Sequence, residues 1–175
     1  MKLYALTFAA QAHASQTRKY TGEPYITHPM EVAKTVASVP NHTDAMICAA
    51  LLHDVVEDCG VTLEEIKQEF GAEVEDLVFW LTDPPTIAGG PNRAERKRMT
   101  RERYEIAPAE AQTIKCADII ANTQSIMEHD PKFGAVYLSE VRALLDVLDR
   151  ADPTLLQRAR AVVSQVIDSN RVTSP

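Results

Sequence analysis

The segment LLHDVVEDCG, residues 51–60, places four ionisable side chains in a stretch that otherwise has the pattern of a buried helix. The four are His53, Asp54, Glu57 and Asp58. In a continuous helix over residues 45–58, at about 100° per residue, they all fall on one arc and the leucines and valines lie opposite. Because burying an unpaired charge costs several kcal/mol, the segment predicts a site that needs these charges.

The carboxylates of this segment are badly placed for an ordinary surface helix. Glu57 and Asp58 fall in the last turn of the predicted helix, where the helix dipole disfavours negative charge. A solvated acidic helix end with a half-buried His53 is one interpretation, and a bound cation is the other. Imidazole and carboxylate ligands together favour a divalent first-row metal such as Mn²⁺, Fe²⁺ or Zn²⁺.

Two residues elsewhere in the chain have the character of further ligands. His28, in YITHPM, comes directly before Pro29, which is predicted to open a helix and so to hold the histidine in place. Asp118, in IKCADIIAN, is a carboxylate in an apolar helical run, where it is costly unless paired or bound to a metal. A hydrogen-bonded core residue is the alternative interpretation at both positions.

The chain has helical periodicity nearly everywhere, and no stretch keeps the alternation of a strand. We predict an all-α fold: a single domain over residues 1–170, built as a bundle of about eight to nine helices, with a frayed tail at 171–175. The predicted helices cover 2–14, 30–38, 45–58, 62–71, 73–81, 92–106, 108–127, 134–150 and 153–167. Thr62 and Glu65 predict a capping box. The Pro- and Gly-rich segment 82–92 is predicted to be a loop and is a candidate lid.

Composition limits the classes of function. The 175 residues carry a formal net charge of −7, which argues against a general nucleic-acid or membrane-surface partner. The apolar stretches are too short to span a membrane. The three cysteines have no CxxC spacing, which argues against a disulfide framework or a zinc ribbon. A cytoplasmic location is therefore expected, and the oligomeric state stays open.

These segments together resemble the HD-domain metal-dependent phosphohydrolases. More narrowly, the chain resembles the (p)ppGpp hydrolase domain of the RelA/SpoT family in its small stand-alone form. The matching segments, in the family's order, are AAQAHASQTRKYTGEPYITHP, AALLHDVVEDCGVTLEEIKQEFGAEVEDLV, ERKR and IKCADIIAN. The resemblance implies an all-helical fold and one Mn²⁺ ion, and it implies four metal ligands: His28, His53, Asp54 and Asp118.

The resemblance also implies an activity. It is hydrolysis of the 3′-pyrophosphate of (p)ppGpp, a small-molecule nucleotide, to GDP or GTP and pyrophosphate. Glu57 and Asp58 match the pair that positions and activates the attacking water. Arg18, Lys19 and Asn122 match residues that contact the substrate.

The resemblance is incomplete after Asp118. The family usually has basic residues where this chain has Ile119 and Gln124. Replacement charge could come from the basic residues of 92–106, or these could form a solvated helix paired with Glu95 and Glu102. Two other functions therefore stay open. One is an HD phosphohydrolase for another phosphorylated nucleotide, such as an NADPH phosphatase, and the other is a non-catalytic domain that binds an alarmone or docks a partner.

Overall fold

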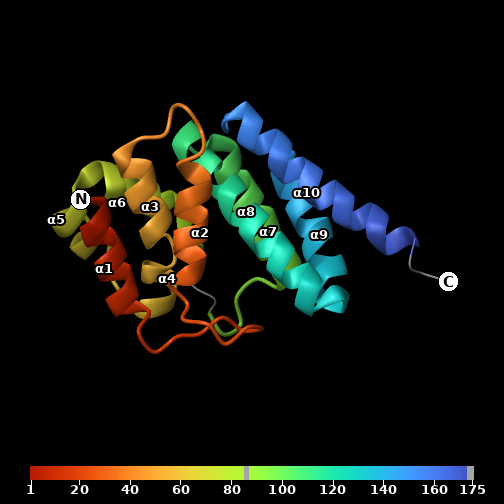
Figure 1. The fold of residues 1–175 in the computed structure, drawn as a ribbon, viewed down its shortest axis with the longest axis horizontal. Coiled ribbons are helices and arrows are strands. Elements are labelled where there is room, and N and C mark those ends of the chain that lie inside the picture. Colours follow the sequence, from red (N-terminus) through yellow and green to blue (C-terminus); the bar gives the residue numbers. More distant parts are fainter. Residues whose placement is uncertain (85–86, 173–175) are drawn as a thin grey trace. The chain divides into compact units, whose positions relative to one another are not determined.

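The computed structural model describes residues 1–84 and 87–172, with side chains up to residue 165. Within this described part the chain forms ten helices, and its one β feature is an isolated bridge between Thr17 and Pro24. The predicted all-α fold is confirmed. The chain divides into two compact units, Met1–Pro91 and Asn92–Pro175, which run from red to green and from green to blue in Figure 1. No helix in the described part is long and apolar enough to cross a membrane.

The first unit is arranged around a central helix. Its helices are α1 (Lys2–Ala12), α2 (Thr27–Val36), α3 (Asp44–Leu52), α4 (Val55–Cys59), α5 (Leu63–Phe70) and α6 (Ala72–Leu81). Helix α3 packs against α1, α2 and α6, and every residue from Ala45 to Leu52 is buried. This fits its sequence, since a helix that is apolar all round belongs inside a core. The end of α3 therefore reaches the interior of the unit, and His53 follows there.

Local sequence signals set the ends of several helices in this unit. The Thr43 side chain accepts a hydrogen bond from the backbone of Met46 at 3.1 Å and caps α3. The predicted capping box of Thr62 and Glu65 is present at the start of α5. Helix α2 begins at Thr27, three residues before the predicted start, so His28 lies in its first turn.

The predicted continuous helix over 45–58 is wrong, because the helix breaks at His53 and Asp54. Asp54 has φ −100° and ψ −7°, in the sparsely occupied bridge region. The His53 ring donates from Nδ1 to the carbonyl oxygen of Ala50 at 2.8 Å, so the side chain satisfies an acceptor at the helix end. Glu57 and Asp58 consequently lie in the first turn of α4, and the expected dipole penalty does not arise.

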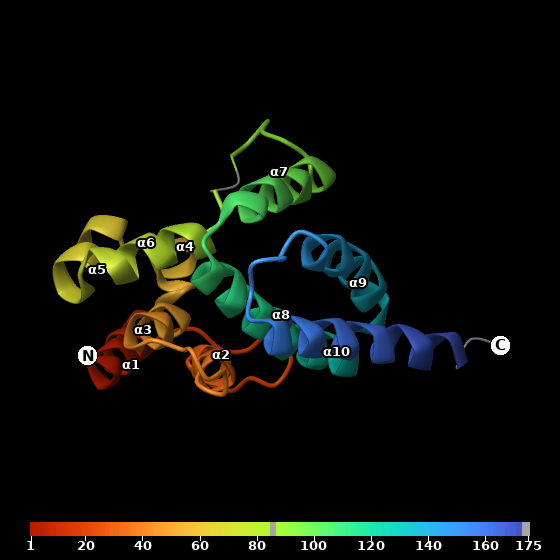
Figure 2. The same ribbon diagram turned by 90° about the horizontal axis from the view of Figure 1, so that it is seen from above.

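The second unit is a four-helix assembly. Its helices are α7 (Arg93–Ile106), α8 (Ala109–His129), α9 (Pro131–Leu145) and α10 (Pro153–Val172). Helix α8 packs against α9 and α10, and α9 also packs against α7 (Figure 2). Buried Gln112 stabilises this unit by donating to the carbonyl of Tyr104 at 2.8 Å and accepting from the backbone of Arg150 at 2.9 Å.

Two element ends differ from the prediction in this unit. Helix α9 begins at Pro131, where the Asp130 side chain caps it, three residues before the predicted start, and it ends at Leu145. Helix α10 continues to Val172, so the predicted tail at 171–175 begins within a helix. Residues 173–175 of that tail, and residues 85–86 of the predicted lid, lie outside the described residues. For its described residues, the segment 82–92 is a loop as predicted.

Candidate metal centre

The break between α3 and α4 brings a carboxylate against two histidines of the first unit. Oδ2 of Asp54 lies 3.0 Å from Nε2 of His53 and 3.8 Å from Nε2 of His28. The two rings are edge to face with centroids 5.2 Å apart, and both histidines are buried, at 2% and 4% exposure. The first turn of α2 and the end of α3 therefore aim both imidazoles at one carboxylate oxygen.

The hydrogen bonding of His53 shows that this arrangement fits a metal ion. Its Nδ1 donates to the Ala50 carbonyl, so in the neutral ring Nε2 carries a lone pair that faces the carboxylate of Asp54. A lone pair and a carboxylate at this distance repel each other unless a proton or a cation lies between them. Two ligand atoms about 2.1 Å from a first-row ion lie about 3.0 Å apart at a right angle and about 4.2 Å apart when opposite. The observed separations of 3.0 and 3.8 Å fall within that range.

Tyr25 also reaches this carboxylate, and the sequence prediction missed it. Its hydroxyl donates to Oδ2 of Asp54 at 2.7 Å. Its ring lies against those of His13 and His28, with centroid distances of 4.7 and 5.9 Å. The available signal was the spacing in PYITHP, which puts Tyr25 three residues before His28 at the start of a helix.

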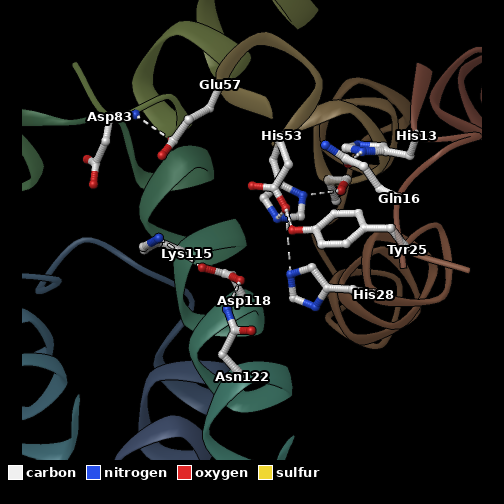
Figure 3. A network of polar contacts seen from close by, with 12 residues as sticks. His13, Gln16, Tyr25, His28, His53, Glu57, Asp83, Lys115, Asp118 and Asn122 are labelled. Atoms are coloured by element: carbon white, nitrogen blue, oxygen red, sulfur yellow. Dashed lines mark hydrogen bonds and ion pairs between the residues drawn. The ribbon is translucent and has the colours of Figure 1, made fainter. Parts of the chain in front are cut away.

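The two carboxylates predicted to activate water lie together on α4. Glu57 accepts a hydrogen bond from the backbone N–H of Asp83 at 3.3 Å (Figure 3). Both side chains reach solvent, yet partial burial of their carboxyl groups raises the pKa of each above its ordinary value. The charge of Asp83 further raises the pKa of Glu57, and the charge of Asp54 further raises that of Asp58. A raised pKa makes a carboxylate a better proton acceptor than an ordinary exposed one.

Asp118 lies on α8 in the second unit and is held by both of its oxygens. The ammonium of Lys115 donates to Oδ2 at 2.8 Å, and the amide of Asn122 donates to Oδ1 at 2.6 Å. Asp118 is 6% exposed, and a carboxylate buried among apolar side chains is costly unless it is paired. These two hydrogen bonds provide that pairing. Each carboxylate oxygen can accept more than one bond, which leaves capacity for a further cation. The prediction missed Lys115, whose spacing of one helical turn from Asp118 was the available signal.

The predicted substrate residues of the first unit lie in a tight loop. The backbone N–H of Arg18 donates to the carbonyl of Glu23 at 2.8 Å, and that of Gly22 donates back to Arg18 at 3.0 Å. Gly22 has φ +73°, a conformation that favours glycine. The ammonium of Lys19 donates to the hydroxyl of Tyr20 at 3.2 Å. Arg18 is half-buried and Lys19 is exposed.

Part of the basic helix α7 is already neutralised. Arg98 forms ion pairs with Glu95 and Glu102, the two partners expected for a solvated helix. Arg93 binds Glu140 through two hydrogen bonds of 2.7 and 2.8 Å. Ile119, which replaces a basic residue of the family, is 2% exposed and belongs to the core of the second unit.

Comparison with known proteins shows the family to which the chain belongs. The chain matches the HD-domain family over residues 5–135. Guanosine-3′,5′-bis(diphosphate) 3′-pyrophosphohydrolase MESH1 of Homo sapiens is 39% identical over 132 residues, which are 74% of this chain and 72% of that protein. A probable GTP pyrophosphokinase of Mycobacterium leprae is 50% identical over 145 residues, 82% of this chain but 18% of that longer protein.

A solved structure is similar over nearly the whole chain. It is a metazoan ortholog of SpoT that is described as hydrolysing ppGpp. It has a TM-score of 0.82 and 28% sequence identity, and the match covers 94% of each chain. The family match includes both LLHDVVED and IKCADIIAN, the segments on which the resemblance was founded. The resemblance is confirmed, and the chain belongs to the HD-domain family.

Proposed function

We propose that this chain is a metal-dependent hydrolase that removes the 3′-pyrophosphate of (p)ppGpp, giving GDP or GTP and pyrophosphate. The observation that carries the proposal is the placement of Oδ2 of Asp54 at ligand distances from both His28 and His53. This placement occurs in a chain that is 39% identical to a protein named as a ppGpp 3′-pyrophosphohydrolase. An activity on the same nucleotide is therefore the simplest function for the site.

Membership of the HD-domain family implies a divalent metal. His28, His53, Asp54 and Asp118 would hold it, and we propose Mn²⁺ as the ion. When bound, the ion supplies positive charge that polarises a phosphate oxygen and lowers the pKa of the attacking water. The family match over residues 5–135 supports the participation of Asp118, because it extends across both units. A single domain over residues 1–170 stays a proposal, and the match supports it for residues 5–135.

The chain's own side chains would carry out the proton transfer and hold the phosphates. Glu57 and Asp58 are neighbours in sequence and carry the same charge, so they would titrate as a coupled pair. One would accept the proton of the attacking water while the other orients that water. Arg18 and Lys19 would bind phosphate oxygens, and the planar guanidinium of Arg18 offers the more rigid contact. Because Asn122 donates to Asp118, we propose that it orients this carboxylate in addition to its predicted contact with the nucleotide.

A second substrate is worth testing because of one observation. Ile119 is buried in the core, so the basic contact that the family usually has at this position is missing. A nucleotide with a single 2′-phosphate, such as NADPH, presents less negative charge than ppGpp and would need fewer basic contacts. The Mn²⁺ preference, the cytoplasmic location and the lack of a nucleic-acid partner stay predictions.

The experiment is a parallel assay of ppGpp and NADPH with product identification. The purified protein is incubated with each nucleotide and Mn²⁺, and the products are separated by anion-exchange chromatography. The proposal predicts GDP and pyrophosphate from ppGpp, and at least tenfold slower turnover of NADPH. If phosphate is released from NADPH faster than pyrophosphate is released from ppGpp, NADPH replaces ppGpp as the proposed substrate. No turnover of either nucleotide by metal-loaded protein would support the non-catalytic alternative.

A further inference from the structure

The carboxylate of Asp54 needs a fixed orientation, and its backbone does not provide one. The rotation of an aspartate carboxyl group about its last bond has no sharp preference. Yet Oδ2 lies close to both His28 and His53. Some partner must therefore hold the group in this orientation against its repulsion from the lone pair of His53.

Tyr25 makes a hydrogen bond of the right kind to do this. At 2.7 Å, its bond to Oδ2 of Asp54 is as short as charge-assisted O–H···O⁻ bonds typically are, about 2.5–2.7 Å. It donates a proton and so favours the charged carboxylate, the form that can bind a cation. It occupies one acceptor position of Oδ2 and leaves the other for an ion.

Tyr25 is in turn held by a side chain from the end of α1. The buried ring of His13 lies against the ring of Tyr25 with centroids 4.7 Å apart and planes inclined by 35°. Nδ1 of His13 bonds to Oε1 of Gln16 and lies 3.1 Å from Sγ of Cys59. The ring of Tyr25 thus packs against a histidine that is itself bonded to Gln16.

The same group of residues reaches α4. The amide of Gln16 donates to the backbone carbonyl of Asp58 at 3.2 Å. One connected set, Tyr25, His13 and Gln16, therefore contacts both the side chain of a proposed ligand and the backbone of a proposed proton acceptor. Figure 3 shows these three residues beside His53.

We propose that Tyr25 is a positioning residue of the metal site, which orients the Asp54 carboxylate and is itself held by His13 and Gln16. The proposal rests on the proposed metal site. Outer partners of metal ligands typically contribute about 10- to 100-fold to metal affinity. Removal of one hydroxyl group from Tyr25 should therefore weaken metal binding by a factor in this range, without a comparable loss of fold stability.

The chain offers a matched control. Tyr4 on α1 also donates its hydroxyl to a carboxylate, at 2.6 Å to Oε2 of Glu69, and its ring lies near those of Phe8 and Phe70. Tyr25→Phe and Tyr4→Phe thus remove the same group and the same type of hydrogen bond. Both substitutions keep the ring, so both variants are expected to fold.

The experiment is a calorimetric titration of metal-free protein with Mn²⁺ alone, together with the melting temperature of each metal-free variant. We expect Tyr25→Phe to bind Mn²⁺ about 10- to 100-fold more weakly, and Tyr4→Phe to bind it as the wild type does. Both variants should melt close to the wild type. Addition of excess Mn²⁺ should restore the turnover of Tyr25→Phe.

Three results would overturn the proposal. They are unchanged Mn²⁺ affinity in Tyr25→Phe, an equal loss of affinity in Tyr4→Phe, and a fall in affinity that accompanies a large fall in the melting temperature of metal-free Tyr25→Phe alone. The titration contains Mn²⁺ and no nucleotide, so its result does not depend on whether the protein hydrolyses ppGpp. A wild type that binds no Mn²⁺ would overturn both the metal site and the positioning role.

Discussion

Nε2 of His53 lies 3.0 Å from Oδ2 of Asp54, although the two residues are neighbours in a segment that reads as one helix. The contact exists because the helix ends at Leu52 and restarts at Val55. The break turns the carboxylate of Asp54 toward the imidazole that precedes it. This turn in the chain converts two adjacent residues into a pair with the geometry of metal ligands.

Replacement of Asp54 by asparagine should abolish most of the metal affinity. The change keeps the shape of the side chain but removes its charge, so we expect Mn²⁺ affinity to fall by more than about 100-fold, beyond the loss expected for an outer partner. Asp76→Asn, on the exposed face of α6, is the control and should bind as the wild type does. Calorimetric titration measures both, and near-normal affinity in Asp54→Asn would remove Asp54 from the ligand set.

Replacement of Glu57 by glutamine should stabilise the metal-free protein at neutral pH. Burial and then the charge of Asp83 raise the pKa of Glu57 above its ordinary value of 4.5, so the folded chain holds this proton to higher pH than the unfolded chain. Stability is therefore lost as pH rises from the ordinary pKa through the raised one, and it stays lower above that range. Glutamine does not titrate and avoids this loss.

Thermal unfolding of metal-free protein between pH 5 and pH 8 measures this effect. The gain in melting temperature for Glu57→Gln should be larger at pH 8 than at pH 5. Glu105→Gln, an exposed position on α7, should show no such trend. A gain that grows as the pH falls would mean that the sign of the pKa shift is wrong.

Replacement of Lys115 by methionine should destabilise the second unit. It removes the ammonium from Oδ2 of buried Asp118 and leaves the amide of Asn122 as a donor to Oδ1, so we expect a loss of about 1–3 kcal/mol in the free energy of unfolding. Lys2→Met is the control, because it breaks an exposed pair with Asp44 that solvent screens and that contributes little to stability. Urea unfolding measures both, and equal losses would show that burial of Asp118 has no special cost.

Replacement of Arg18 by alanine should weaken substrate binding more than turnover. A hydrogen bond to a charged group contributes about 1.5–3 kcal/mol, so we expect KM for ppGpp to rise roughly tenfold or more with a smaller change in kcat. Arg98→Ala is the control, since Arg98 is already paired with Glu95 and Glu102. If both variants keep the wild-type KM, Arg18 is an ordinary surface residue.

The features that depend on residues close together in the sequence were predicted from it. The capping box of Thr62 and Glu65 needs only residues of one turn, and it is present. The all-α fold follows from periodicity that continues along the chain. The expected partners of Arg98 also lie one turn away on the same helix, and two ion pairs join them.

The break at His53 could not be predicted in this way. The helical periodicity continues from Leu51 to Val56, and no glycine or proline interrupts it. The bond of Tyr25 to Asp54 spans 29 residues of sequence, and a periodic pattern contains no information about such a contact. The proposed role of Tyr25 was missed for the same reason.

The most direct test of the central claim is pyrophosphate release from ppGpp by protein with Mn²⁺ and by the same protein stripped with a chelator. We predict release at about 1 s⁻¹ or faster with Mn²⁺, an ordinary enzymatic rate, loss of release after stripping, and recovery when Mn²⁺ is returned. Release that continues unchanged in the stripped protein, or no release by protein shown to contain the ion, would contradict the account.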